Sequence, residues 1–418
     1  MDKIFNNTSV KSRIRAISSK SEAHRALICA ALADRKTKLI CTDLNADIEA
    51  TVDCLRSLGA KIDREGDVFT ISPIETPMQN AALDCNESGS TLRFMLPLCA
   101  SLGADCSFIM RGRLASRPLS PLYELLSENG VTLSAHGISP LNISGKLLPG
   151  NYSVTANISS QYISGLLFAL SVADGSSTLA LVGKVESAPY IWMTVDTLQK
   201  FGADIKFDFD KNTFYINGKD RLISPSTFEV FGDWSNAAFF LCAGAIGSHS
   251  VTLSNLDPES RQGDRSIISV LREMGAMIDC NAETGELTVY PSKLGGIRID
   301  ASDIPDLVPV LSVVASVAEG ETVIYNASRL RLKESDRIES VCTTLRSLGA
   351  LISPLDDGMV IRGKKKLTGG YVDSFNDHRI AMSAAIASLV CTGEVRISRF
   401  EAINKSYPSF LDGWEIKD

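Results

Sequence analysis

The chain has 418 residues, 44% of them hydrophobic and 22% charged, with a formal net charge of −7 and an isoelectric point near 5.3. An acidic balance of this kind argues against nucleic acid or an anionic membrane surface as a partner, and we expect neither. The ten cysteines are scattered without a CxxC pair, only four histidines accompany them, and the N-terminus lacks the apolar segment of a signal peptide. We therefore expect no metal site, no disulfide framework and a cytoplasmic location.

One pattern recurs six times along the chain. It consists of a polar opening, an apolar stretch of about a dozen residues, a turn containing Gly or Asp, and a short run typical of a strand. The openings read SKSEAHR, ESGSTLR, ISSQYIS, GDWSNAA, IPDLVPV and FNDHRIA. The turns are marked by Asp34, Gly103, Gly175, Gly247, Gly320 and Gly393, which follow one another at intervals of 69 to 73 residues. A period this regular indicates an internal repeat.

A second pattern keeps the same period and ends a helix that is charged on one face. The segments read LRSLGA, LSENGV, LQKFGA, LREMGA and again LRSLGA. Their glycines are Gly59, Gly130, Gly202, Gly275 and Gly349, and we expect each at a helix C-terminus with left-handed backbone. The sixth copy, expected after Lys405, is cut off by the chain end. Each repeat is thus predicted to contain two helices and several strands, including paired strands such as residues 60–72.

The two helix types differ in where they should lie. The first type is apolar nearly all round, as in SGLLFALSVA, so it should be buried inside a domain, whereas the second type should lie at a surface. The apolar runs are shorter than the ~20 residues of a membrane span. We expect no membrane span.

The length of the chain exceeds what one hydrophobic core normally serves, so we expect two domains of three repeats each. The first would comprise residues 19–228, and the second would combine residues 1–18 with residues 229–418. The N-terminal segment could supply a strand to the second domain.

Polar side chains gather at the openings of the apolar helices. A buried helix N-terminus carries unpaired N–H groups and a partial positive charge, so it attracts anions. Ser21 and Arg25 are four residues apart and should share a helix face. Asp306 follows Pro305 and leads directly into an apolar helix, so we expect it to cap that helix. If the buried helices are parallel, the sequence predicts a basic cleft for a small, multiply anionic ligand. The cations concerned are Lys20, Arg25, Arg117, Lys333, Arg337, Arg379 and Lys405.

Nine motifs, in order from Lys20 to Pro408, resemble those of the 5-enolpyruvylshikimate-3-phosphate synthase family. They are SKSEAHRAL, SGSTLR, ASRPLSPL, SSQYISGLL, ESAPY, IPDL, RLKESDRI, NDHRIAM and NKSYP. The resemblance implies an α/β (α+β) fold, a two-domain inside-out α/β barrel of six βαβαββ repeats, three per domain. It implies transfer of the enolpyruvyl group of phosphoenolpyruvate to the 5-hydroxyl of shikimate 3-phosphate. No cofactor is implied, and we expect a monomer.

The same resemblance implies roles for individual residues. Catalysis would fall to Asp306, Glu334, Lys20 and Lys405. Shikimate 3-phosphate would be bound by Lys20, Ser21, Arg25, Ser159, Ser160, Gln161, Ser187, Asp306 and Lys333. Phosphoenolpyruvate would be bound by Lys20, Gly89, Arg117, Gln161, Arg337, His378, Arg379 and Lys405.

Two other functions are alternatives to this reaction. A UDP-N-acetylglucosamine enolpyruvyl transferase would have a GAKN-type first motif and a loop cysteine, whereas this chain has SKSEAHR and the segment RGRLASRPL without cysteine. A non-catalytic protein that binds phosphorylated metabolites would keep the serines but would not need Asp306, Glu334 and two lysines together. The chain also departs from the family pattern, with ISSKS for PGSKS, Glu87 for Asn and Ser90 for Thr.

Overall fold

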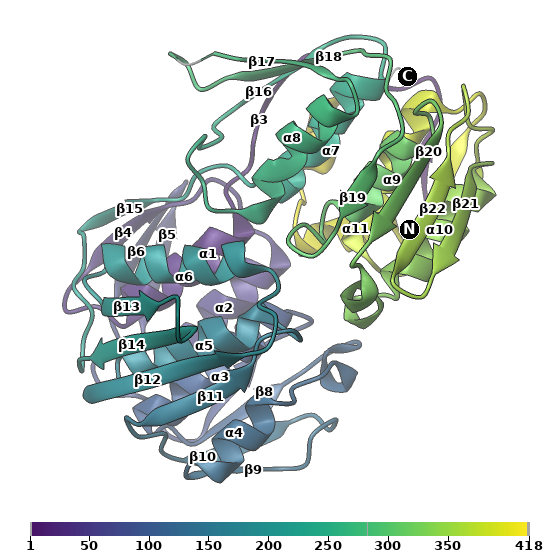
Figure 1. Ribbon diagram of the computed structural model, residues 1–418. Helices are drawn as coiled ribbons and strands as arrows, with labels where there is room; N and C mark the ends of the chain where they lie inside the picture. Colours follow the sequence, from purple (N-terminus) through teal and green to yellow (C-terminus); the bar gives the residue numbers. More distant parts are fainter. Residues whose placement is uncertain (1, 282, 416–418) are drawn as a thin grey trace. The chain divides into compact units, whose positions relative to one another are not determined.

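The computed structural model describes residues 2–281 and 283–415 (Figure 1). The chain divides into two compact units, each with its own hydrophobic core. The first unit is Ser18–Val230, and the second combines the described residues before Ser18 with those from Phe231 onward. No helix of the described residues is both long and apolar enough to cross a membrane.

The first unit contains three four-stranded sheets, ordered β15-β4-β6-β5, β7-β8-β10-β9 and β11-β12-β14-β13. Each sheet joins one parallel pair to two antiparallel pairs, and each repeat adds two helices. The strands are β4 (Thr37–Ile40), β5 (Lys61–Glu65), β6 (Val68–Ser72), β7 (Ala81–Asp84), β8 (Cys106–Ile109), β9 (Val131–Leu133), β10 (Leu141–Gly145), β11 (Asn151–Thr155), β12 (Gly175–Val182), β13 (Asp204–Asp208), β14 (Thr213–Gly218) and β15 (Thr227–Glu229). The helices are α1 (Lys20–Ala31), α2 (Ala46–Ser57), α3 (Gly89–Leu102), α4 (Leu122–Glu128), α5 (Ser160–Ser171) and α6 (Ala188–Lys200), with the 3-10 turn η1 (Leu114–Ser116).

The second unit has two sheets of the same kind, ordered β17-β18-β16-β3 and β19-β20-β22-β21, together with a three-stranded sheet β1-β24-β23 and a short β2-β25 pair. Its strands are β1 (Lys3–Phe5), β2 (Ser9–Val10), β3 (Arg13–Arg15), β16 (Val251–Ser254), β17 (Met277–Cys280), β18 (Leu287–Tyr290), β19 (Arg298–Asp300), β20 (Glu321–Tyr325), β21 (Leu351–Leu355), β22 (Gly358–Arg362), β23 (Gly370–Asp373), β24 (Val395–Ser398) and β25 (Trp414–Glu415). Its helices are α7 (Trp234–Ile246), α8 (Ile267–Glu273), α9 (Val308–Ala315), α10 (Arg337–Ser347) and α11 (His378–Ala387). The 3-10 turns are η2 (Gly263–Ser266), η3 (Ser328–Leu332), η4 (Ser388–Val390), η5 (Phe400–Lys405) and η6 (Phe410–Gly413).

The chain crosses between the units twice, and each crossing exchanges a strand. β3 pairs in parallel with β16 of the second unit, and β15 pairs in parallel with β4 of the first (Figure 1). The expectation that the N-terminal segment supplies a strand to the later repeats is therefore confirmed. The leading strands of the first and fourth repeats have changed places.

The two helix types lie as their sequences predict. The residues of α5 from Tyr162 to Ser171 are all buried, and so are those of α7 from Trp234 to Ala245. The second type ends at the expected glycines, with φ of +116° at Gly59 and +87° at Gly349, a conformation that glycine adopts at low cost. In the sixth repeat η5 stands where the second helix would begin.

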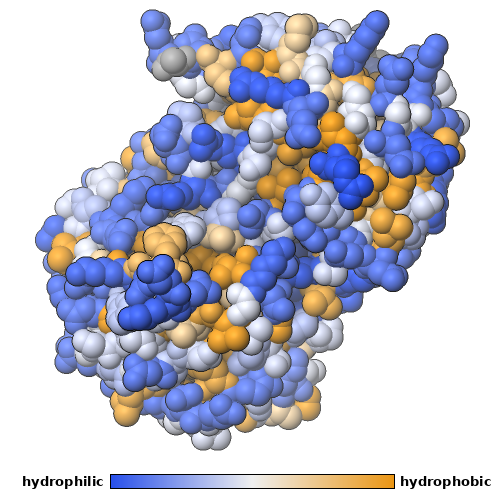
Figure 2. Space-filling view, viewed as in Figure 1, coloured by the Kyte–Doolittle hydropathy of each residue, from blue (hydrophilic) through white to orange (hydrophobic). Residues whose placement is uncertain are grey.

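Helices α3 and α5 pack so closely that the backbone of one lies against the backbone of the other. A Cβ placed on Gly165 of α5 would lie 2.2 Å from the carbonyl oxygen of Arg93 and 2.9 Å from the ring of Pro97. Because Pro97 has no N–H to donate within α3, the Arg93 carbonyl lacks its usual helical partner there. This contact fixes how closely the two helices pack. On the face shown in Figure 2, hydrophilic side chains predominate and hydrophobic ones form patches between them.

Candidate active site

The predicted site residues fall into two sets, one in each unit. In the first unit, Lys20 opens α1 and its Nζ lies 2.8 Å from the Asp47 carboxylate, with both side chains 16% exposed. Asp47 stands in the first turn of α2 and was not among the predicted site residues. Its position at the opening of a second-type helix is the signal that could have identified it.

Arg25 lies buried between α1 and α6. Its Nη1 donates to the Ser21 carbonyl at 2.6 Å, its Nη2 to the Tyr190 carbonyl at 2.9 Å, and its Nε to the Thr194 hydroxyl at 2.7 Å. The predicted proximity of Ser21 and Arg25 is confirmed. Burial lowers the pKa of Arg25 to about 10, against opposing contributions from Tyr190 and Glu22. The guanidinium thus remains charged at neutral pH and ties the two helix openings together.

Two arginines meet at the N-terminus of α3. Arg93 donates to the Gln161 side-chain oxygen at 2.7 Å, and Gln161 donates to the Ser90 hydroxyl at 2.8 Å. A Cβ on Gly89 would lie 2.7 Å from Nη1 of Arg93 and 2.9 Å from Nη1 of Arg117. Both guanidinium groups therefore lie against the bare Cα of Gly89. A helix N-terminus beside two guanidinium groups favours an anion.

The serines lie at the openings of α5 and α6. Ser159 caps α5 by accepting a hydrogen bond from the Gln161 backbone N–H at 3.3 Å, and Ser160 follows it in the first turn. Ser187, which precedes α6, has left-handed backbone with φ of +52°. Such a conformation is uncommon outside glycine and often marks functional sites. The segments before α5 and α6 are joined by the Glu186 N–H, which bonds to the Ala156 carbonyl at 3.3 Å.

In the second unit Asp306 does not cap α9, so that expectation was wrong. The helix begins at Val308, and the Asp306 carboxylate instead accepts hydrogen bonds from Arg337 at 2.7 Å and Arg379 at 3.3 Å. The Nζ of Lys333 lies 4.0 Å from the same carboxylate. Two arginines distant in sequence outcompete the backbone N–H groups of the adjacent helix because charge-assisted hydrogen bonds are the stronger ones.

Arg337 is the centre of this charge cluster. Its Nη2 donates to Glu334 at 2.8 Å and its Nε to Asp377 at 2.8 Å, in addition to the bond with Asp306. The side chains of Arg337 and Asp377 are 2% and 0% exposed, whereas those of Asp306 and Glu334 are 25% and 22% exposed. The arginine is thus enclosed, and the two predicted catalytic carboxylates remain accessible.

Charge in the cluster is balanced rather than basic. The cations Lys333, Arg337 and Arg379 are matched by the carboxylates of Asp306, Glu334 and Asp377. Burial alone would raise the pKa of Asp306, but Arg379, Lys333 and Arg337 together hold it well below its usual range. Burial lowers the pKa of Lys333 to about 8, although Asp306 raises it. Lys333 can therefore change its charge within reach of neutral pH.

Asp377 was present in the NDHR motif but received no predicted role. Its carboxylate accepts from the backbone N–H of Arg379 at 2.9 Å and from the Ser335 hydroxyl at 3.0 Å, as well as from Arg337. One buried carboxylate thus fixes both arginines that pair with Asp306. His378 is 3% exposed and lies with its Nδ1 4.0 Å from Asp377. The Nζ of Lys405 donates to the Asn376 carbonyl at 2.8 Å, at the opening of α11.

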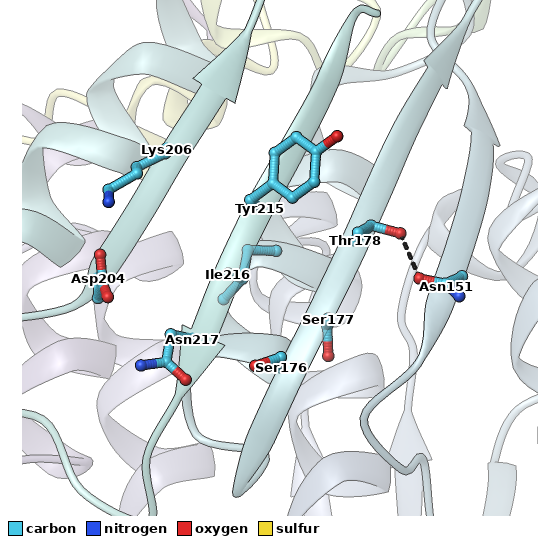
Figure 3. Close-up of a pocket in the computed structure, with 9 residues that line it drawn as sticks. All are labelled: Asn151, Ser176, Ser177, Thr178, Asp204, Lys206, Tyr215, Ile216 and Asn217. Carbon is cyan, nitrogen blue, oxygen red and sulfur yellow. Dashed lines mark hydrogen bonds between the residues drawn. The ribbon is translucent and has the colours of Figure 1, made fainter.

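A shallow hollow lies elsewhere in the first unit, on the outer face of sheet β11-β12-β14-β13 (Figure 3). Its walls include Lys206, Tyr215 and Thr178, and the Thr178 hydroxyl donates to the Asn151 side chain at 2.7 Å. None of the predicted site residues lines this hollow.

Comparisons with known proteins agree over the whole chain. A family model described as EPSP synthase (3-phosphoshikimate 1-carboxyvinyltransferase) matches residues 5–414. A 3-phosphoshikimate 1-carboxyvinyltransferase of Clostridium novyi is 42% identical over 408 residues, which cover 95% of this chain and 93% of the relative. One from Clostridium perfringens is 43% identical over 415 residues, covering 99% and 96%.

Solved structures show the same fold. An EPSP synthase from Acinetobacter baumannii aligns with a TM-score of 0.80 and 26% identity, covering 100% of this chain and 99% of that one. The enolpyruvyl transferase NikO from Streptomyces tendae aligns with a TM-score of 0.78 over 99% and 96% of the two chains, but at 17% identity it supports the fold alone. The predicted α/β fold class is confirmed.

Proposed function

Because the chain belongs to the EPSP synthase (3-phosphoshikimate 1-carboxyvinyltransferase) family and transfers the enolpyruvyl group of phosphoenolpyruvate to shikimate 3-phosphate, we propose that the openings of its buried helices carry this reaction. The resemblance drawn from the motifs is thereby confirmed, and the reaction belongs to aromatic amino-acid biosynthesis. The observation that supports the proposed site most strongly is the Asp306 carboxylate, accessible on one side and held by Arg337 and Arg379 on the other.

Both substrates carry a phosphate and a carboxylate, so bringing them together requires cations close by. We assign shikimate 3-phosphate to Lys20, Ser21, Arg25, Ser159, Ser160, Gln161, Ser187, Asp306 and Lys333, mainly in the domain of residues 19–228. We assign phosphoenolpyruvate to Lys20, Gly89, Arg117, Gln161, Arg337, His378, Arg379 and Lys405, with the last four in the domain of residues 1–18 and 229–418. Since all these residues come from one chain, we also propose that a cytoplasmic monomer suffices.

The reaction has an addition step and an elimination step. In the first, the 5-hydroxyl of shikimate 3-phosphate gives its proton to Asp306 while its oxygen bonds to C2 of phosphoenolpyruvate, and C3 receives a proton from Glu334, assisted by Lys20 or Lys405. In the second, C3 gives a proton back to Glu334 and the C2–O bond to phosphate breaks, which restores the C2–C3 double bond, forms the enol ether of the product and releases phosphate. A positioned base and a positioned acid are needed in both steps.

The two arginines also govern how basic Asp306 is. While both guanidinium groups face its carboxylate, the pKa of Asp306 stays far below that of a useful base. Anionic groups of phosphoenolpyruvate at Arg337 and Arg379 would compete with the carboxylate for the same N–H groups. We propose that the base becomes effective through this exchange.

Replacing Arg117 tests the division between the substrates. We expect Arg117→Ala to weaken the binding of phosphoenolpyruvate roughly tenfold to a hundredfold, which is the cost of losing a hydrogen bond to a charged group. The dissociation constant of shikimate 3-phosphate should stay within about threefold of the wild-type value. Isothermal titration with each substrate gives both constants, and Arg35→Ala, at an exposed arginine of the same unit, is the control. Loss of shikimate 3-phosphate binding with phosphoenolpyruvate binding intact would contradict the assignment.

Gly89→Ala should change ligand choice more than folding. The atoms nearest the new methyl group would be the guanidinium nitrogens of two arginine side chains, at 2.7 and 2.9 Å, so these side chains would have to shift rather than the helix. Glyphosate competes with phosphoenolpyruvate in this family, and we expect its inhibition constant to rise roughly tenfold, about 1.4 kcal/mol, with a smaller loss for phosphoenolpyruvate. Gly295→Ala is the matched control because its Cβ would meet no atom closer than 4.0 Å. An unchanged ratio of the two constants in Gly89→Ala would remove Gly89 from the site.

The affinity for shikimate 3-phosphate should fall as pH rises through about 8, where Lys333 loses its charge. Below that pH the ammonium is present and attracts the anion, so binding at pH 9 should be about tenfold weaker than at pH 7. Lys333→Arg keeps its charge throughout this range and should flatten the profile. Titration calorimetry at several pH values would refute the assignment if the wild type and Lys333→Arg gave the same dependence.

A further inference from the structure

A buried polar network surrounds the opening of α7 in the second unit, and the roles proposed above do not use it. It consists of Asp233, Ser235, Gln262 and Asp264, which are 2%, 2%, 2% and 0% exposed. Gln262 and Asp264 come from the segment at η2, about thirty residues after the other two. Burying polar side chains costs free energy, so four of them at one helix opening require a physical explanation.

The contacts of this network lead to Arg379. Gln262 donates from Nε2 to Asp233 at 3.0 Å and to the Ser235 hydroxyl at 2.7 Å, and its Oε1 accepts from the Trp234 backbone N–H at 3.0 Å. The Ser235 hydroxyl also bonds to the Asp264 carboxylate. The backbone carbonyl of the same serine accepts from Nη1 of Arg379 at 3.0 Å. Asp264 therefore acts on Arg379 through Ser235.

Arg379 is suited to a ligand. Its side chain is 3% exposed, and among the described residues its Nε has no hydrogen-bond partner. Its other two nitrogens bond to Ser235 and Asp306. A buried guanidinium with an unused donor can still donate to one further acceptor.

Asp264 is surrounded by charges of both signs. The ionisable groups that most affect its pKa are Asp306 before α9, Arg379 on α11 and Asp233 before α7, while α8, which follows it, opens with apolar residues. Burial raises its pKa to about 7, Asp306 and Asp233 add to this, and Arg379 opposes it. An anion arriving at Arg379 would cancel the opposing influence and add negative charge nearby.

We propose, resting on the function proposed above, that Asp264 is a positioning residue for Arg379 and takes up a proton from solvent when phosphoenolpyruvate binds at that arginine. The protonated carboxyl still bonds to the Ser235 hydroxyl, so Arg379 keeps its place while one negative charge is removed from beside the bound anion. An asparagine at this position would support Ser235 equally well but could not change its charge.

Proton uptake measured by calorimetry separates these cases. Phosphoenolpyruvate alone is titrated into the full chain at pH 7.5 in Tris and in Pipes, whose ionisation enthalpies differ, with wild type, Asp264→Asn and the exposed-site control Asp210→Asn. The ionisation of the ligand itself contributes equally to all three. We expect the wild type and Asp210→Asn to take up roughly half a proton more than Asp264→Asn. Equal uptake in wild type and Asp264→Asn would overturn the inference.

A second measurement uses the wild-type chain alone, in case Asp264→Asn does not fold. With aspartate carboxyl carbons labelled with carbon-13, one signal should titrate near neutral pH and move to higher pH when phosphoenolpyruvate is added. A chain without such a signal, or with one that phosphoenolpyruvate leaves unmoved, contradicts the inference while the proposed function stands. A chain that binds no phosphoenolpyruvate at all contradicts the proposed function itself.

Discussion

Asp306→Asn should lower kcat by about 10²- to 10⁴-fold, the range expected when a positioned base is lost. The substitution keeps the shape of the side chain and removes its charge and proton affinity. Because the Asp306 carboxylate competes for Arg337 and Arg379, we expect the affinity for phosphoenolpyruvate to be kept or increased. A fall in kcat with a constant or lower dissociation constant distinguishes a base from a residue that only binds substrate.

Steady-state kinetics and calorimetry of the same preparations provide both values. Asp303→Asn is the matched control, since Asp303 lies three residues away and is exposed. It should retain the kcat of the wild type. A kcat of Asp306→Asn within about threefold of the wild type would exclude the proposed role.

Arg337→Met should destabilise the second unit by about 3–5 kcal/mol, as expected when one partner of a buried ion pair is removed. Asp377 is 0% exposed and would be left without its guanidinium, while Glu334 and Asp306 would lose a shared partner. Hydrogen exchange followed by mass spectrometry on peptides of the second unit reports this change separately from the first.

Two further variants make that result specific. Arg362→Met removes an arginine that is paired with Glu321. The Arg362 side chain is 74% exposed, so this substitution should destabilise the unit far less. Adding Asp377→Asn to Arg337→Met should recover part of the lost stability, because the uncompensated buried charge is gone. Equal protection against hydrogen exchange in Arg337→Met and Arg362→Met would show that the buried ion pair contributes no more to stability than the exposed one.

The repeat architecture could be predicted because its signals are local. Gly59 and Gly349 mark helix ends by their own backbone preference, and apolar runs such as that of α5 report burial residue by residue. The motifs identified the family and, through the family, the substrates. The exchange of β3 and β15 could be predicted only in part, because nothing in the sequence of a three-residue strand specifies which sheet it joins.

The side-chain pairs of the site could not be predicted in the same way. Asp306 was expected to cap the adjacent helix, and the partners that hold it instead lie 31 and 73 residues further along the chain. Asp47 and Asp264 were missed because their partners, Lys20 and Ser235, belong to other elements. Such pairs depend on how separate repeats pack, whereas propensity and capping rules describe one element at a time.

The most direct test of the proposed function measures phosphate release by the purified chain with shikimate 3-phosphate, phosphoenolpyruvate, both together, and UDP-N-acetylglucosamine with phosphoenolpyruvate. We expect release only when shikimate 3-phosphate and phosphoenolpyruvate are both present, and its loss in Asp306→Asn with both substrates still bound. Release with UDP-N-acetylglucosamine instead, or binding of both substrates without any turnover in the wild type, would contradict the proposed function.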